Sequence, residues 1–472
     1  MWFYLFFLLL VLLLYWRQSK LWQNLLLTCL SLLFYGWINW RFPVFLIVFS
    51  TTIFFLSNKI VDSPSHRGKK KWLFVNLALG LGCLSYFKYA NFFINNIVLI
   101  TNSIGYHISN FEIYILLPLG ISFLTFSALT YPLDLYFNKR NRTVSFVEFI
   151  TFVTFLPKLF AGPIARAHDF MKVLSERRKF NIENFEDGCI RILTGCFKKI
   201  VIADNMAIYL VNPVTSAPDS YSTMMLWLAM FGYAIQIYAD FSGYSNVAIG
   251  SAKILGLRIP ENFSFPYLAT HFSDFWRRWH ITMSTFFRDY VYIPLGGSRK
   301  GNLRTALNLL LTMLICGLWH GPSWLFVIWG GLHGFYLIVD RYINLVINQI
   351  EWGEAGKKYW LRWCGRIFRW SYTQILVCFA WVLFSSPNFT LGISYLRNLF
   401  AGGSDRPLLL APAVTIGFIA FFIDHLYGWS VKVWPEIDRR YIPLRAVAYS
   451  FMIIMLFQLV PEKRNPFIYF QF

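Results

Sequence analysis

The sequence predicts an all-α, polytopic membrane protein, and two observations support this prediction. Of the 472 residues, 57% are hydrophobic and only 14% are charged, whereas a soluble domain carries about a quarter charged residues. Apolar runs long enough to cross a hydrocarbon core of about 30 Å recur along the whole chain. Disordered chains, coiled coils and ordinary cytosolic enzymes are therefore excluded.

The first part of the chain alternates apolar runs with basic loops. Lys and Arg follow the first, third and fifth runs, whereas the segments between them carry only Arg41. By the positive-inside rule, this alternation predicts an N-terminus outside the cytoplasm and five consecutive crossings. The first basic residue, Arg17, comes after the first apolar run, so we expect no cleaved signal peptide. The first four runs are residues 1–15, 21–35, 44–56 and 72–86.

The next apolar stretch, residues 146–165, is split by Pro157 and Lys158 and has basic clusters on both sides. A broken, re-entrant segment keeps both clusters on one side, so we expect that arrangement. Residues 240–302 are too polar to cross. The other spans are expected near 190–211, 223–238, 305–319, 323–339, 370–384, 407–423 and 444–459. The total is about eleven or twelve crossings plus two non-crossing segments, in a single domain over residues 1–472 with its C-terminus outside.

The net charge of +20 arises from 43 basic and 23 acidic residues. Because much of it lies in the predicted cytoplasmic loops, it accounts for orientation and contact with anionic lipid, and nucleic acid is not needed to explain it. The seven cysteines form no CxxC or Cys/His pattern, so we expect neither a metal site nor a disulfide framework. The GxSxG, HExxH and GxGxxG patterns are absent, so hydrolase and dehydrogenase functions have no support.

Three regions concentrate polar residues near apolar spans: 235–246, 275–289 and 317–334. In the first, Gln236 and Asp240 end a span that we expect Gly243 to break. Ionisable groups at such depths usually face a cavity or a partner. In the third, His320 lies between two spans, where a neutral imidazole suits proton transfer from a hydroxyl. The alternative is a histidine that caps a helix or bonds a carbonyl in a tight turn.

Two further histidines accompany His320. His280 follows Arg277 by three residues, which predicts one helix face; it would add a polar group to the same cavity, or belong to an interfacial amphipathic helix. His333 could share the site only if the chain folds back at Pro322 or at residues 330–331, and a packed structural histidine is favoured there. The segment 294–301 could cradle phosphate, but a basic cytoplasmic loop is the favoured interpretation.

Six motifs in order resemble the membrane-bound O-acyltransferase (MBOAT) family, and in particular its AlgI-like bacterial branch. The motif-bearing core covers about residues 123–345, and the motifs are YPLDLY 131–136, FLPKLFAGPI 155–164, YADFSGY 238–244, FWRRWH 275–280, YIPLGG 292–297 and WHG 319–321. The resemblance implies an MBOAT-like bundle of helices around a central cavity. It also implies acyl transfer from a cytoplasmic thioester to a hydroxyl reached from the other side, with His320 as the essential histidine and His280 as the second polar position.

The chain ends in FIYFQF, residues 467–472, which resembles the FxYxxF ending associated with this branch. The resemblance implies that Tyr469 accepts the acyl group and relays it to an outer transferase. The alternative is an aromatic belt at the end of the last span.

The resulting functional hypothesis is transfer of acetyl from acetyl-CoA, as a donor substrate, to a surface polysaccharide that is alginate-like or peptidoglycan. His320 would be the base, His280 would position the thioester or stabilise its oxyanion, and an extracytoplasmic SGNH-type acetyltransferase would receive the acetyl group from Tyr469. Three arginines would hold the CoA phosphates: Arg277, Arg278 and Arg288. The expected location is the bacterial cytoplasmic membrane, and the alternatives are D-alanyl transfer to teichoic acid and a non-enzymatic transporter.

Overall fold

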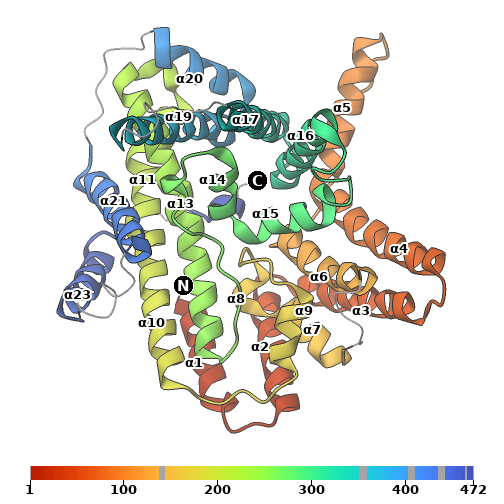
Figure 1. The fold of residues 1–472 in the computed structure, drawn as a ribbon. Helices are drawn as coiled ribbons and strands as arrows, with labels where there is room; N and C mark the ends of the chain where they lie inside the picture. Colours follow the sequence, from red (N-terminus) through yellow and green to blue (C-terminus); the bar gives the residue numbers. More distant parts are fainter. Residues whose placement is uncertain are drawn as a thin grey trace. The chain divides into compact units, whose positions relative to one another are not determined.

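The computed structural model describes residues 2–109, 111–137, 144–349, 359–401, 410–433, 442–462 and 465–470. Throughout these residues the regular structure is helical, with no strand (Figure 1). The predicted all-α fold class is therefore confirmed. Seven helices in the described part are long and apolar enough to cross a membrane: Lys20–Ile38, Arg41–Asp62, His66–Ser103, Thr223–Ile254, Gly301–His320, Trp363–Ser385 and Pro412–Ser430. The protein is thus a multi-pass membrane protein, and the total of about eleven or twelve crossings stays a prediction.

Contacts within the chain divide it into two compact units, each described by itself. The first unit comprises Met1–Ile192 and Ser245–Pro260, and the second comprises Leu193–Tyr244 and Glu261–Phe472. The assignment of residues 1–472 to one domain stays a prediction.

The first unit contains the N-terminal helices, in which α3, α4 and α6 pack against one another (Figure 1). The stretch that was predicted as a span near 72–86 belongs to a longer continuous helix, because α4 passes through one π turn directly into α5. The helices are α1 Trp2–Tyr15, α2 Lys20–Ile38, α3 Arg41–Asp62, α4 His66–Leu84, η1 Ser85–Tyr89, α5 Ala90–Ser103, α6 Ile121–Tyr136, α7 Phe146–Thr154, α8 Leu156–Leu159, α9 Ala167–Leu174 and α10 Ile182–Cys196.

The predicted break in the stretch 146–165 is confirmed. Helix α7 ends at Thr154, and Phe155 leaves the helical conformation before the single turn α8. The backbone N–H of Leu156, which the break frees, donates to Ser31 Oγ at 3.2 Å. Lys158 in that turn is buried, and its ammonium lies 4.1 Å from the ring centroid of Phe152 as a cation–π contact. Whether the segment re-enters the membrane from one side stays a prediction.

The second unit holds the remaining helices, among which α16, α17 and α19 pack in sequence (Figure 1). They are η2 Phe197–Ala203, α11 Asp204–Met206, η3 Ala207–Val211, α12 Asn212–Ser216, η4 Pro218–Ser220, α13 Thr223–Ile254, η5 Pro266–Leu268, α14 Phe272–Arg278, α15 Ile281–Phe287, η6 Arg288–Tyr292, α16 Gly301–His320, α17 Trp324–Gln349, α19 Tyr359–Ser385, α20 Phe389–Ala401, α21 Pro412–Val433, α23 Ile442–Gln458 and η7 Ile468–Phe470. Helices α10 and α13 each contribute residues to both units.

The predicted helix break at Gly243 was wrong, because α13 continues through this residue to Ile254. A Cβ atom here would lie 2.8 Å from the carbonyl oxygen of Gly195 and 3.1 Å from the backbone nitrogen of Lys199. Glycine in a membrane helix permits such a close approach of two backbones. Gly243 is therefore a packing residue, and it brings α13 close to the segment that carries Lys199.

Helices α16 and α17 form a hairpin that turns at Gly321 and Pro322. Their backbones approach so closely that a Cβ at Gly317 would collide with the carbonyl oxygen of Phe326, and one at Gly330 with that of Met313. The hairpin brings the C-terminal end of α16, where His320 lies, against the first turns of α17.

Candidate active site

His320 is the last residue of α16 and is buried. Its ring is enclosed by aromatic rings with centroids at 5.1 Å for Trp319, 5.0 Å for Trp329 and 5.2 Å for Phe384. These rings come from α16, α17 and α19 and exclude water from the imidazole. The burial of a histidine at a helix end, beside the turn of a hairpin, gives it a fixed position among apolar neighbours.

His280 lies in a turn rather than on a helix. It connects α14 to α15 with a left-handed backbone at φ 41°, which is uncommon for a residue other than glycine. The predicted helix face shared with Arg277 was therefore wrong, because the helix ends at Arg278. Strained backbone of this kind concentrates at functional sites. His280 is completely buried.

Asn262 fixes the tautomer of His280. Asn262 Oδ1 lies 3.0 Å from His280 Nδ1 and also accepts from the backbone N–H and the hydroxyl of Thr282, at 3.3 and 2.9 Å. Since a backbone N–H can only donate, the amide atom that faces it is the oxygen, and Nδ1 must carry the proton that is shared with this oxygen. Burial lowers the pKa of His280 to about 3, so the ring is neutral at physiological pH and Nε2 carries a lone pair.

Tyr469 belongs to the same cluster, although it lies almost at the end of the chain. Its ring centroid is 5.6 Å from that of His320 and 6.4 Å from that of His280. Phe241 of α13 lies 4.6 Å from both the Tyr469 ring and the His280 ring and packs between them. Desolvation raises the pKa of Tyr469 well above that of a free tyrosine, so its hydroxyl stays protonated at neutral pH.

The three predicted arginines lie outside this aromatic cluster and differ in their surroundings. Arg278 Nε donates to Asp274 at 2.9 Å and its NH1 donates to the carbonyl of Ser264 at 3.3 Å, so this side chain fastens a turn. Arg288 is exposed and pairs with Asp289 at 2.8 Å. Arg277 is exposed as well. Because Arg277 and Arg288 are exposed whereas the donors of Arg278 are already bonded within the turn, Arg277 and Arg288 are better placed to contact a large anionic substrate.

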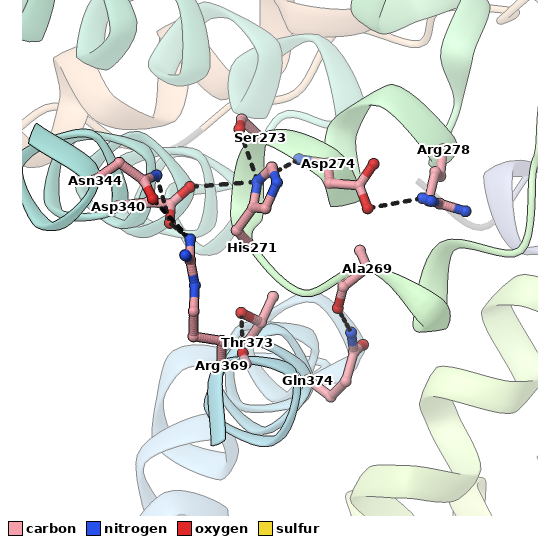
Figure 2. A network of polar contacts seen from close by, with 10 residues as sticks. All are labelled: Ala269, His271, Ser273, Asp274, Arg278, Asp340, Asn344, Arg369, Thr373 and Gln374. Carbon is pink, nitrogen blue, oxygen red and sulfur yellow. Dashed lines mark hydrogen bonds and ion pairs between the residues drawn. The ribbon is translucent and has the colours of Figure 1, made fainter. Parts of the chain in front are cut away.

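A polar network holds the segment that precedes His280 against α17 and α19, as Figure 2 shows. Gln374 Nε2 donates to the carbonyl of Ala269 at 2.6 Å, and Arg369 donates to Asn344 at 2.7 Å. His271 Nδ1 accepts from the backbone N–H of Asp274 at 3.1 Å and so caps α14. Because this nitrogen accepts, it carries no proton, and its 3.7 Å contact with Asp340 involves a neutral ring.

The hairpin folds back, as a site shared by His320 and His333 would require, and the two histidines contact the same tryptophan. Trp329 lies between the two, with its centroid 5.0 Å from His320 and 4.8 Å from His333. His333 also packs against Trp276 at 5.1 Å and Tyr336 at 5.7 Å. Its favoured interpretation as a packed histidine agrees with these surroundings.

Two residues near the site, Asn262 and Lys199, were not among the predicted site residues. Asn262 lies in an irregular loop, where no periodicity marks one asparagine among others. Lys199 is partly buried beside Asp240. It lies within an apolar stretch that we predicted as a span, and a charge at such a position was itself a signal of a paired group. Among the described residues no three His, Cys, Asp or Glu side chains gather as a metal site would require.

A multi-pass helical protein with two buried histidines and a tyrosine in one aromatic cluster has the groups needed for proton transfer to and from a hydroxyl. The comparison with known families identifies the class of enzyme to which this arrangement belongs. The profile of the membrane-bound O-acyltransferase family, MBOAT, matches residues 1–382, and the chain belongs to this family. It is therefore an acyltransferase, which replaces the transporter alternative.

Individual relatives agree with this assignment. A probable alginate O-acetylase AlgI from Pseudomonas putida is 32% identical, in an alignment that covers 97% of this chain and 96% of the relative. A peptidoglycan O-acetyltransferase from Helicobacter pylori is 33% identical over 81% of this chain and 74% of the relative. A teichoic acid D-alanyltransferase from Bacillus subtilis is 28% identical over 57% of this chain and 69% of the relative.

Proposed function

We propose that this protein transfers acetyl groups from cytoplasmic acetyl-CoA across the membrane for O-acetylation of a surface polysaccharide, either alginate-like or peptidoglycan. The single observation that carries the proposal is the 5.6 Å separation between the rings of His320 and Tyr469. It pairs a buried base with a hydroxyl nucleophile at the terminus of the chain. The names of the alginate O-acetylase, which matches almost the full length, and of the peptidoglycan O-acetyltransferase, which covers 81% of this chain, support acetyl as the acyl group and a polysaccharide as the acceptor.

In the first step the hydroxyl oxygen of Tyr469 attacks the carbonyl carbon of the acetyl thioester. His320 takes the phenolic proton, the C–S bond breaks, and CoA leaves as a thiol after it receives that proton. General-base catalysis of this kind contributes about 10²–10⁴-fold in rate. Because desolvation raises the pKa of Tyr469, the hydroxyl does not ionise by itself and the base is required.

The tautomer of His280 refines its role. With Nδ1–H directed at Asn262, the neutral ring offers Nε2 only as an acceptor. An acceptor cannot donate to a developing oxyanion, so the predicted oxyanion role is disfavoured. The single proton of the Tyr469 hydroxyl is directed to His320, so we assign His280 the remaining predicted role, positioning of the thioester donor, with Asn262 as the residue that fixes its ring.

On the donor side, the exposed guanidinium groups of Arg277 and Arg288 would form charge-assisted hydrogen bonds to the phosphates of acetyl-CoA. Arg278, whose donors already bond Asp274 and Ser264, would contribute mainly to the shape of the turn. In the second step a nucleophile of an extracytoplasmic SGNH-type acetyltransferase would attack the acetyl ester of Tyr469. That step regenerates the tyrosine and moves the acetyl group toward the polysaccharide.

The proposed setting is the bacterial cytoplasmic membrane with both termini outside, as the distribution of basic residues indicates. D-alanyl transfer to teichoic acid is the alternative within the family. The D-alanyltransferase matches only 57% of this chain, whereas the alginate O-acetylase matches 97%. The comparison therefore favours acetyl transfer over D-alanyl transfer.

Incubation of the purified protein with radiolabelled acetyl-CoA, followed by mass spectrometry of the C-terminal peptide, tests the proposal. Tyr469 should gain one acetyl group in the wild type. The Tyr469→Phe variant should gain none, and His320→Ala should be slower by about 10²-fold or more. Tyr114→Phe and His107→Ala, both at exposed positions, are the matched controls. Unchanged acetylation in His320→Ala, or label that accumulates elsewhere on the chain, would contradict the mechanism.

A further inference from the structure

A cluster of one partly buried lysine and two buried carboxylates lies where α13 meets the segment after α10. Lys199 Nζ is 2.9 Å from Asp204 Oδ1 and 2.9 Å from Asp240 Oδ1. The same ammonium donates a hydrogen bond to the carbonyl oxygen of Asn465 at 3.1 Å. An ammonium group has three N–H donors, which matches these three oxygen partners in number. One of the three belongs to the C-terminal tail, residues 465–470.

The carboxylate of Asp240 makes a second contact with the tail. Its Oδ2 accepts a hydrogen bond from the backbone N–H of Ile468 at 2.9 Å. Asp240 thus bridges Lys199 and the residue directly before Tyr469. A third side chain, Asn205, donates to the carbonyl of Leu459 at 3.0 Å and holds the chain where it leaves α23.

The tail supplies hydrogen-bond partners to this cluster of charges. The two carboxylates that contact the Lys199 ammonium have side chains only 4% exposed. Buried charges are costly unless opposite charges and hydrogen bonds compensate them. The N–H of Ile468 stabilises the negative charge of Asp240, and the carbonyl of Asn465 accepts from Lys199. The docked tail therefore satisfies groups that its departure would leave uncompensated.

We infer that Lys199 and Asp240 form a clasp of positioning residues, which docks the tail and thereby keeps Tyr469 beside His320 and His280. The catalytic meaning of this inference rests on the proposed relay through Tyr469, whereas the docking itself does not. The clasp acts on the backbone on the N-terminal side of the tyrosine, at Asn465 and at the adjacent Ile468. Lys199 and Asp240 thereby orient the phenol of Tyr469 toward the aromatic cluster, but they do not contact the reacting atoms themselves.

Two variants of the full-length protein separate docking from folding. Lys199→Met removes the ammonium and keeps an unbranched apolar stem. Asp240→Asn keeps an oxygen that can accept from Ile468 but removes the charge that attracts Lys199. Lys199→Arg retains the positive charge and should restore much of the docking. Lys253→Met, which removes a lysine paired with Asp187 at 3.0 Å in the first unit, is the matched control.

Hydrogen–deuterium exchange of the C-terminal peptide measures docking, and acetylation of Tyr469 from radiolabelled acetyl-CoA measures its consequence. In Lys199→Met we expect amide exchange in the tail to rise about tenfold or more, since hydrogen bonds to charged groups are lost. Exchange in peptides from α16 and α17 should stay as in the wild type, which a general loss of folding would not allow. Tyr469 acetylation should fall by about the same factor, and Asp240→Asn should change both readouts in the same direction but less.

Unchanged tail exchange in both variants would overturn the clasp. Normal Tyr469 acetylation in a variant whose tail exchanges rapidly would overturn its positioning role. If Lys199→Met does not fold, Asp240→Asn decides with the same two readouts. If the wild-type tail is protected and loosens as expected but Tyr469 is never acetylated, the relay fails and the docking function of Lys199 and Asp240 is supported.

Discussion

His280 Nδ1 and Asn262 Oδ1 lie 3.0 Å apart, and the same oxygen accepts two further hydrogen bonds from Thr282. Three donors converge on one carbonyl oxygen inside the protein. Because both His280 and Asn262 are completely buried, the ring cannot exchange this partner for water. The relationship selects one tautomer of the histidine and keeps its second nitrogen as an acceptor.

Replacing Asn262 with aspartate should add a pH dependence to the acetylation rate that arises from the titration of His280. Burial lowers the pKa of His280 in the wild type to about 3, so this ring stays neutral throughout pH 5–9. A carboxylate at position 262 would raise the pKa of His280 by about 1–3 pH units, because an opposite charge favours the protonated ring. As the pH falls through this raised value, Nε2 takes a proton and can no longer act as a hydrogen-bond acceptor in the site.

The measurement is the rate of Tyr469 acetylation between pH 5 and pH 8. The ratio of the rate at pH 8 to that at pH 5 should be larger in Asn262→Asp than in the wild type. Asn302→Asp adds the same charge at an exposed position that contacts Arg341, and should leave the wild-type ratio unchanged. Identical pH profiles for all three proteins would contradict the role assigned to His280.

The sequence pattern predicted the helical class, a break within the stretch 146–165 and the candidate residues His280, His320 and Tyr469, because apolar runs and recurring motifs are local signals. It could not predict that Asn262 orients His280, since this contact depends on the path of an irregular loop. It also led to a wrong break at Gly243. Glycine weakens a helix in isolation, but here the close approach of Gly195 requires the absence of a side chain. Tertiary packing overrode the local preference.

The three arginines should separate by their kinetic effects. Arg277→Gln and Arg288→Gln remove exposed charges, so we expect a higher KM for acetyl-CoA with little change in thermal stability. Arg278→Gln removes hydrogen bonds to Asp274 and Ser264, and should lower stability by about 1–3 kcal/mol. Initial rates at varied acetyl-CoA, with a thermal melt of each variant, measure both effects. A lowered Tm without any change in KM for Arg277→Gln would contradict a donor-binding role.

Adding one methyl group at Gly317 should destabilise the α16–α17 hairpin. The new Cβ would collide with the carbonyl oxygen of Phe326, so the two helices must separate and His320 must move with the end of α16. We expect a loss of about 1–3 kcal/mol in stability and a marked fall in acetylation. Gly365→Ala is the control, since nothing lies within 4 Å of its Cβ position in α19. Alanine there should be neutral or stabilise the helix by up to about 1 kcal/mol. Equal melting temperatures for the two variants would contradict the close packing.

His333 should tolerate replacement by phenylalanine, in contrast to His320. Neither ring nitrogen of His333 has a hydrogen-bond partner among the described residues. The ring packs among the aromatic side chains of Trp276, Trp329 and Tyr336. A buried polar group that lacks a partner costs about 1–3 kcal/mol, and phenylalanine removes this cost while it keeps an aromatic ring. The larger ring adds some crowding, which offsets part of the gain.

We therefore expect His333→Phe to fold with a stability close to that of the wild type and to retain at least about a tenth of its acetylation rate, the loss arising from small shifts of Trp329. His320→Phe should also keep the aromatic packing but lose the base, so its rate should fall by about 10²-fold or more. Both variants keep an aromatic ring and remove the imidazole nitrogens, so their comparison shows at which position these nitrogens are required. A loss of activity in His333→Phe as deep as that in His320→Phe, with an unchanged melting temperature, would contradict a purely packing role for His333.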